Sequence, residues 1–312
     1  MIEKQTKQSI AAGIEDLMLQ YAALIVDIKN SKKYGDDVRE KLQRHLSVSQ
    51  KYLNALFSQS IEKPVVFSGG DEVQGLFRDP LNAFLYYRFL NMLLDPITIR
   101  GGIGVGDWKV KLDDAASTAQ DGPVYHHARE AVNRAKSNRY YNLFLVSREP
   151  SDENTTVLMD YPLGTGRMRT TKQNEFALIV EILFPLREKA YPPTRLQGVN
   201  QNDSESIVES LCRFKQAFSQ ASSLSEKLRE GIKTMQFQWP SETEIALDKW
   251  TSTHSGLISE QERIAYLPTQ TLANLLGMTK QGINRQIVES RVVQERISVA
   301  YVSQYMKGPV GQ

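Results

Sequence analysis

Cysteine is nearly absent from this sequence, since Cys212 is the only one among 312 residues. A single cysteine excludes internal disulfides and a zinc site built on cysteine pairs. The four histidines, His45, His126, His127 and His254, show neither metal-ligand spacing nor an HExxH pattern. We therefore expect no zinc chemistry of these kinds, and we expect Cys212 to be a small buried residue.

Long hydrophobic runs are also lacking. No window approaches the roughly 18 unbroken apolar residues of a membrane span. Residues 1–20 carry charges throughout and have no apolar core of signal-peptide length. We therefore expect a cytoplasmic protein with no membrane partner. A large positive excess is missing too, because the net charge is only +2, so any DNA contact must come from a local surface.

Apolar residues make up 41% of the chain, enough for the cores of two compact domains. Hydrophobic periodicity predicts strands at 21–27, 65–68, 73–77, 97–105 and 140–146, and helices at 36–60, 81–94 and 121–135. The second and third strands form a hairpin whose turn is GGDE, residues 69–72. This order predicts an α/β fold, an α+β sandwich with helices on one side of a mixed sheet. The loop after Asp27 and the turn around Asp71 should then meet at one sheet end.

The second half of the chain is expected to be organised differently. Residues 148–206 are rich in polar residues, glycine and proline, and they surround an apolar run at 176–184 that we expect to be a strand. Residues 206–233 predict a polar amphipathic helix. We therefore divide the chain into a sheet domain at 1–150, a strand-containing insertion with a connecting helix at 151–240, and a separate all-α domain at 241–312.

Carboxylates stand where the chain turns at this sheet end. Asp27 closes the first strand, and Asp71 and Glu72 lie in the hairpin turn. Hard divalent cations prefer such oxygen ligands, so these residues and the carbonyl of Ile28 form a candidate site for Mg²⁺ or Mn²⁺. The alternative is structural, because an aspartate at a strand end and a GGDE sequence are both ordinary turn formers.

Other residues beside the carboxylates suit a nucleotide. Gly69 and Gly70 remove side chains where a nucleotide would approach the backbone. Lys29 and Ser31 follow the first aspartate closely and would line a phosphate loop, or else belong to a solvated turn. In the helix at 121–135, Arg129 would meet phosphate and Tyr125 would stack on a base or bond a ribose. The alternative there is a surface helix with an ion pair and a half-buried tyrosine.

Four segments occur in one order: AALIVDIKNS, FSGGDEVQGLF, TIRGGIGVG and DGPVYHHAREAV. Together they resemble the nucleotidyl cyclase superfamily, which has a palm-like sheet, over roughly residues 21–146. The resemblance implies that Asp27 and Asp71 bind metal and that Arg129 stabilises a triphosphate. Tyr125 stands where cyclases typically place a ribose-orienting asparagine. Sites of this superfamily usually form between two subunits, which implies a homodimer.

A helix-turn-helix is predicted at residues 272–287, LANLLGMTKQGINRQI. Ala273, Gly277 and Ile283 meet its packing needs at offsets of four and six residues. The second helix would enter the major groove of double-stranded DNA with five residues, Thr279, Lys280, Gln281, Asn284 and Arg285. The alternative is a three-helix bundle, completed by a helix at 259–267, that serves protein contacts or dimerisation. An apolar run at 288–305 could supply a dimer helix.

A sheet of this kind followed by a helix-turn-helix resembles the SatD family of bacterial proteins. The resemblance and the motifs predict a DNA-binding regulatory protein whose cyclase-like domain senses a nucleoside triphosphate or signalling nucleotide. The alternative from a different class is an active nucleotidyl cyclase or oligonucleotide synthase. A scaffold with vestigial sites is the third interpretation.

Overall fold

The computed structural model describes residues 21–186, 201–218, 223–234 and 267–307. The predicted order of strands and helices up to residue 146 is confirmed. The elements are β1 (Tyr21–Ile28), α2 (Asp36–Leu56), β2 (Ile61–Gly69), β3 (Glu72–Phe77), α3 (Pro80–Leu93), β4 (Ile99–Gly106), α4 (Pro123–Ser137) and β5 (Leu143–Val146). Two short 3-10 turns, η1 (Ser31–Lys33) and η2 (Ser117–Ala119), interrupt the loops.

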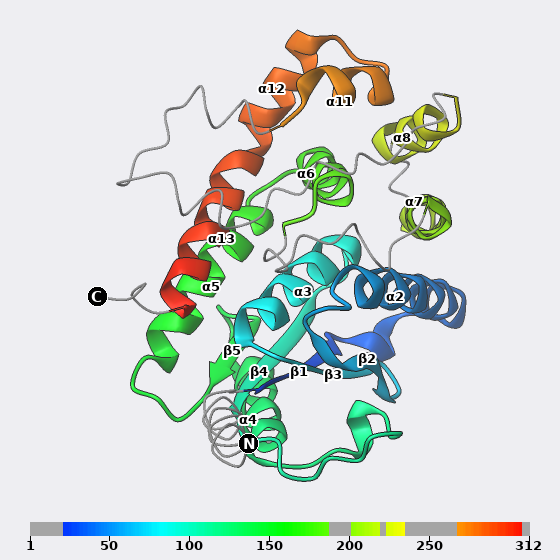
Figure 1. The fold of residues 1–312 in the computed structure, drawn as a ribbon. Coiled ribbons are helices and arrows are strands. Elements are labelled where there is room, and N and C mark those ends of the chain that lie inside the picture. Colours follow the sequence, from blue (N-terminus) through cyan, green and yellow to red (C-terminus); the bar gives the residue numbers. More distant parts are fainter. Residues whose placement is uncertain (1–20, 187–200, 219–222, 235–266, 308–312) are drawn as a thin grey trace, which may run out of the picture.

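The strands form one mixed sheet in the order β2-β3-β1-β4-β5. The central strand β1 is antiparallel to β3 and β4, and β5 is parallel to β4. Helices α2 and α3 cover one face and α4 covers the other (Figure 1). The prediction of helices on one side is therefore wrong. The reason lies in the continuous apolar run of β1, because its alternate residues enter different cores: Leu24 and Val26 lie in one, and Ala23 and Ile25 in the other.

The helix expected at 36–60 ends earlier, at Leu56, and Pro64 lies inside the edge strand β2. The pairing of β2 with β3 shifts register between Lys63 and Val66, around this proline. An edge strand tolerates proline at such an irregularity because one ladder hydrogen bond is already missing.

The predicted strand at 176–184 is wrong, because these residues belong to a helix. Helices α5 (Asp152–Arg167) and α6 (Thr171–Leu183) follow the sheet. A capping box between Thr170 and Gln173 starts α6, and every residue from Phe176 to Leu183 is buried. A run that is apolar on all sides has no period by which strand and helix can be distinguished. The single helix expected at 206–233 is instead two, α7 (Gln201–Ala217) and α8 (Ser223–Thr234).

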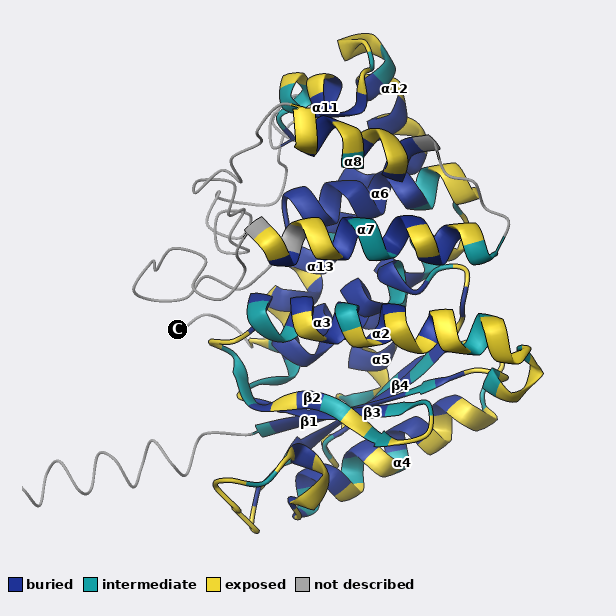
Figure 2. Cartoon of the chain, turned by 90° about the vertical axis from the view of Figure 1, so that its right-hand side faces the viewer, coloured by how far each residue is buried: buried dark blue, intermediate teal, exposed yellow. Residues whose placement is uncertain are grey.

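The C-terminal helices are α11 (Thr269–Leu276), α12 (Lys280–Ser290) and α13 (Val292–Met306). They pack on α8, α6 and α5 respectively, and their buried side chains belong to the same apolar cluster as those of α3 and α6. Figure 2 shows α11 and α12 at one end of the molecule and α4 at the other. The expected boundary at 241 and most of the helix expected at 259–267 lie outside the described residues. None of the described helices combines the length and the hydrophobicity that a membrane span requires.

Candidate functional site

Two of the three predicted carboxylates, those of Asp27 and Glu72, meet at one end of the sheet, on the face that α4 covers. Asp27 is the penultimate residue of β1, and Glu72 begins β3. Val26 pairs with Val73 in an antiparallel ladder, so Asp27 lies beside Glu72. Their side chains are 14% and 15% exposed, which places both carboxylates in a partly dry environment where charges interact more strongly than in water.

Three cations surround these two carboxylates. Arg100, which pairs with Asp27 across the β1–β4 ladder, donates from Nη2 to Asp27 Oδ2 over 2.6 Å. Arg129 on α4 donates two hydrogen bonds to Glu72, of 2.6 and 2.8 Å. The Nζ of Lys136 lies 3.4 Å from Asp27 Oδ1 and 3.9 Å from Glu72 Oε2. The ammonium of Lys136 therefore joins the two carboxylates.

These contacts hold Glu72 in its charged form. Burial by itself raises the pKa of Glu72. Hydrogen bonds from Arg129 and Ser68, and the charges of Arg129 and Lys136, lower this pKa by more, so the net shift is downward. The same hydrogen bond to Glu72 raises the pKa of Arg129. The site therefore brings two carboxylates and three basic side chains into contact. A divalent cation bound to the carboxylates would release Arg129 and Lys136 to contact an anion.

Asp71, the other predicted ligand, lies in the hairpin turn next to Glu72. Its side chain makes no hydrogen bond or ion pair with a described residue. Gly70 before it has a φ of 61°, a conformation that favours glycine. A Cβ built on Gly69 or Gly70 meets no atom within 4 Å, so open space lies beside the turn. Among the described residues, no three Asp, Glu, His or Cys side chains converge as a preformed metal site.

The other predicted site residues lie near the same end of the sheet and differ in how far their side chains are buried. The side chain of Ile28 is buried in the core between the sheet and α2 and α3. Lys29 is exposed and Ser31 begins η1, directly after β1. Tyr125 is only 7% exposed and packs beneath the sheet with Trp108, and its hydroxyl has no hydrogen-bond partner among the described residues. This placement favours the packing interpretation of Tyr125.

Sequence reasoning missed Lys136 at this site. The available indication was its spacing, because Lys136 follows Arg129 by seven residues, which is two helical turns and therefore the same face of α4.

The five predicted DNA-contacting residues lie together on α12 and its N-cap. Thr279 caps the helix by accepting a hydrogen bond from the backbone N–H of Gly282. The remaining four, Lys280, Gln281, Asn284 and Arg285, are exposed. Gly277 ends α11 in the left-handed conformation that the turn requires. The arrangement leaves one polar, partly basic helix face open to solvent at the end of the molecule opposite α4 (Figure 2).

Comparison with known proteins gives one family match. A family model described as the SatD family matches residues 21–183, which is just over half of the 312-residue chain. This match covers the sheet and helices α5 and α6, and it includes the candidate site. Neither a curated protein nor a solved structure matches the chain.

Proposed function

The chain belongs to the SatD family, and from this premise we propose that it is a nucleotide-responsive DNA-binding regulator. It binds a nucleoside triphosphate or signalling nucleotide, together with Mg²⁺ or Mn²⁺, at the acidic sheet end. It contacts double-stranded DNA through α12. Two copies act together, because a net charge of +2 from residue 259 onward, six Lys or Arg against four Glu, favours only modest affinity per subunit.

The observation that carries the proposal is that the carboxylates of Asp27 and Glu72 lie together and contact three basic side chains. Asp27 and Glu72 supply the hard oxygen atoms that Mg²⁺ and Mn²⁺ prefer, and Asp71 beside them has no other described partner. Mg²⁺ is usually held by one or two carboxylates and completes its shell with substrate phosphates and water. Two converging carboxylates therefore suit a metal that arrives with a nucleotide. Arg129 and Lys136 then neutralise the phosphates.

A catalytic alternative has one observation in its favour. Arg129, the counterpart of the triphosphate-stabilising arginine in cyclases, is in direct contact with Glu72. An active cyclase or oligonucleotide synthase would release pyrophosphate from nucleoside triphosphates with Mn²⁺, and Asp27→Asn would abolish the release. Tyr125 occupies the position of the ribose-orienting asparagine of cyclases, but its side chain is packed in an apolar cluster and does not present a polar group to a ribose. We therefore favour sensing over catalysis.

Thermal unfolding tests the nucleotide site. A nucleotide at about a hundredfold over its Kd should add roughly 2.7 kcal/mol to the unfolding free energy. We expect this stabilisation to require Mn²⁺ or Mg²⁺ and to be lost in Asp27→Asn and Glu72→Gln. Asp37→Asn removes a comparable carboxylate from an exposed ion pair with Lys41 and should leave it intact. If no nucleoside triphosphate stabilises the wild type with either metal, the proposed site is wrong.

Titration with DNA tests the second part of the proposal. Arg213 is a matched control for Arg285. Both arginines are exposed, and each forms an ion pair with a glutamate one helical turn away, Arg285 with Glu289 and Arg213 with Glu209. Arg285→Ala should weaken DNA binding by about 1–3 kcal/mol at constant salt, and Arg213→Ala should not. Equal losses for the two variants would mean that α12 does not read DNA.

A further inference from the structure

A second polar cavity lies on the other side of the same sheet end. It has a volume of about 290 Å³ and is lined by residues of α3, α5, the start of α6 and α13. Its polar lining includes Arg88, Arg167, Arg169, Asn91, Asn174 and Glu295. Thr98, just before β4, forms part of the wall. Most of its lining comes from helices on the α3 side of the sheet, whereas Asp27 and Glu72 contact Arg129 and Lys136 of α4 on the opposite side, so this cavity is separate from the site already described.

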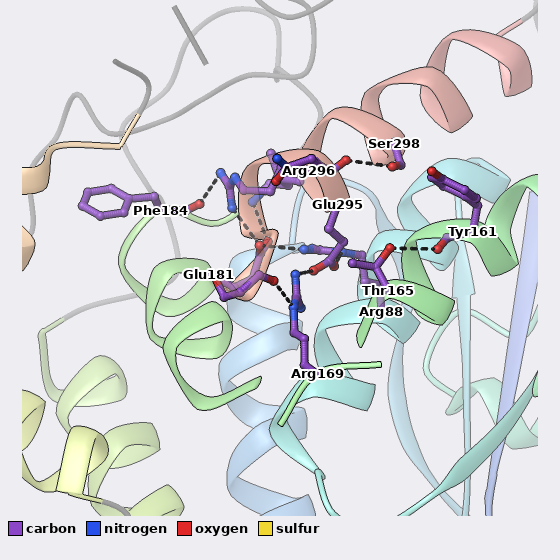
Figure 3. A network of polar contacts seen from close by, with 12 residues as sticks. Arg88, Tyr161, Thr165, Arg169, Glu181, Phe184, Glu295, Arg296 and Ser298 are labelled. Atoms are coloured by element: carbon purple, nitrogen blue, oxygen red, sulfur yellow. Dashed lines mark hydrogen bonds and ion pairs between the residues drawn. The ribbon is translucent and has the colours of Figure 1, made fainter. Parts of the chain in front are cut away.

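A buried ion network forms one wall of the cavity (Figure 3). Arg88 on α3 donates to Glu181 on α6 over 3.0 Å and to Glu295 on α13 over 2.7 Å. Arg296 donates to Glu181 over 2.7 Å and to the carbonyl oxygen of Phe184. Arg169, in the loop between α5 and α6, forms an ion pair with Glu295.

The charges of this network do not balance. Three guanidinium groups, on Arg88, Arg169 and Arg296, face two carboxylates, on Glu181 and Glu295, and every one of these side chains is at most 3% exposed. The excess of one positive charge is therefore held away from water, which is costly unless an anion compensates it.

The neighbouring charged groups do not supply that anion. Arg167 forms hydrogen bonds of 2.6 and 2.9 Å with Asp160, so these two groups neutralise each other. Asp95, which also lines the cavity, is paired with the buried ammonium of Lys215 at 3.0 Å. The imbalance of the network consequently remains at the cavity wall.

Three buried atoms of the network have no partner with hydrogen-bond geometry among the described residues: Nη2 of Arg169, Oε2 of Glu295 and Nε of Arg296. The first two lie close together as an ion pair. Nε of Arg169 is occupied, since it donates to the carbonyl oxygen of Ser290, the last residue of α12. The N-terminal turn of α6, through Thr171 and Asn174, adds the positive end of a helix dipole to the cavity.

We propose that this cavity binds a small metabolite through a carboxylate or phosphate group, which compensates the excess charge at Arg169. The volume is near the lower limit of small-molecule sites, which restricts the ligand to a few heavy atoms beyond its anionic group. A bound anion contacts Arg169, whose other hydrogen bond holds the end of α12. The cavity is therefore an effector site beside the helix that we propose reads DNA.

Thermal unfolding of the full-length chain, without metal or nucleotide, tests this site with inorganic phosphate and with succinate. We expect at least one of these anions to raise the Tm saturably by about 2–4 °C, compared with chloride at equal ionic strength. Which one does so separates a phosphate site from a carboxylate site. The Arg169→Gln variant removes the excess positive charge and should weaken the apparent affinity about tenfold, and Arg213→Gln, an exposed ion-paired control, should not.

Three further variants test whether the anion binds in this cavity. Asn91→Asp puts a carboxylate into the cavity without changing side-chain size and should weaken binding as strongly as Arg169→Gln. Gln294→Glu makes the same charge change on an exposed position of α13 and should not. Arg129→Gln, at the sheet end described above, should leave anion binding intact. A shift that does not saturate, or one that only Arg129→Gln removes, would overturn the proposal.

Discussion

At the residue scale, the acidic sheet end arises from the alternation of side chains along neighbouring strands. Asp27 and Glu72 point to the same face because β1 and β3 pair in register, and α4 then brings Arg129 and Lys136 over them. The sequence predicted the carboxylates and Arg129 individually. It did not predict their ion pairs, because these depend on how α4 lies across the sheet.

A buried histidine provides a prediction at this scale. His45 on α2 lies between Leu93 and Ser210, with 2.9 Å contacts at each ring nitrogen, and stacks on Phe214. The carbonyl oxygen of Leu93 only accepts, so Nε2 carries the proton and Nδ1 accepts from the hydroxyl of Ser210. Burial lowers the pKa of His45 to about 4, against the opposing hydrogen bond to Leu93 and with help from the charge of Lys215.

The folded pKa of His45 lies below the unfolded value of 6.5, so the unfolded chain takes up this proton first as the pH falls. The contribution to stability is complete above about pH 6.5 and is lost between pH 6.5 and 4. Chemical denaturation should therefore show a loss of about 2 kcal/mol between pH 7.5 and 5.0. The loss should disappear in His45→Gln and persist in His126→Gln, which changes an exposed histidine. An unchanged loss in His45→Gln would contradict the assignment.

At the element scale, α4 lies on β4 more closely than side chains would allow. A Cβ built on Gly104 would lie 2.1 Å from the backbone nitrogen of Ala128, and one on Gly102 would lie 2.2 Å from that of Val132. The glycines of β4 are therefore required by the approach of the helix backbone. That approach is also what brings Arg129 and Lys136 to the carboxylates.

Substitution of these glycines should separate the helix from the sheet. Gly104→Ala should lower the free energy of unfolding by about 3 kcal/mol, because neither backbone can move without disturbing the core. Gly69→Ala is the matched control, since its Cβ meets no atom within 4 Å, and it should change stability by less than about 0.5 kcal/mol. Urea denaturation of the two variants measures the difference. If the two variants lose similar amounts of unfolding free energy, the backbones of α4 and β4 are not in close contact.

At the scale of the whole molecule, helices α11, α12 and α13 are joined to the sheet by a continuous apolar core. Helix α13 runs back from α12 along α5 (Figure 1). Its residues Glu295 and Arg296 enter the buried ion network with Arg88 on α3 and Glu181 on α6. Most of the apolar residues expected to form a dimer helix are buried within this chain, although Val288, Tyr301 and Tyr305 remain exposed.

This connection predicts one cooperative unfolding transition in calorimetry. Glu181→Gln leaves the guanidinium groups of Arg88 and Arg296 without a full counter-charge and should move the entire transition, with a loss of about 3–5 kcal/mol. Glu209→Gln, which breaks an exposed pair with Arg213, should change stability by less than about 1 kcal/mol. A second, earlier transition in Glu181→Gln would show that α11–α13 unfold independently.

The sequence by itself determined the order of strands and helices up to residue 146, the GGDE hairpin and the polar face of α12. These features depend on local periodicity, turn residues and caps, which a single sequence records. Tertiary structure alone decided that residues 176–183 are helical, that helices cover both faces of the sheet, and that Lys136 joins Asp27 to Glu72. It also decided the ion network and its cavity. Burial on all sides erases the period that distinguishes helix from strand, and contacts between residues as distant as Arg88 and Glu295 leave no trace in local sequence.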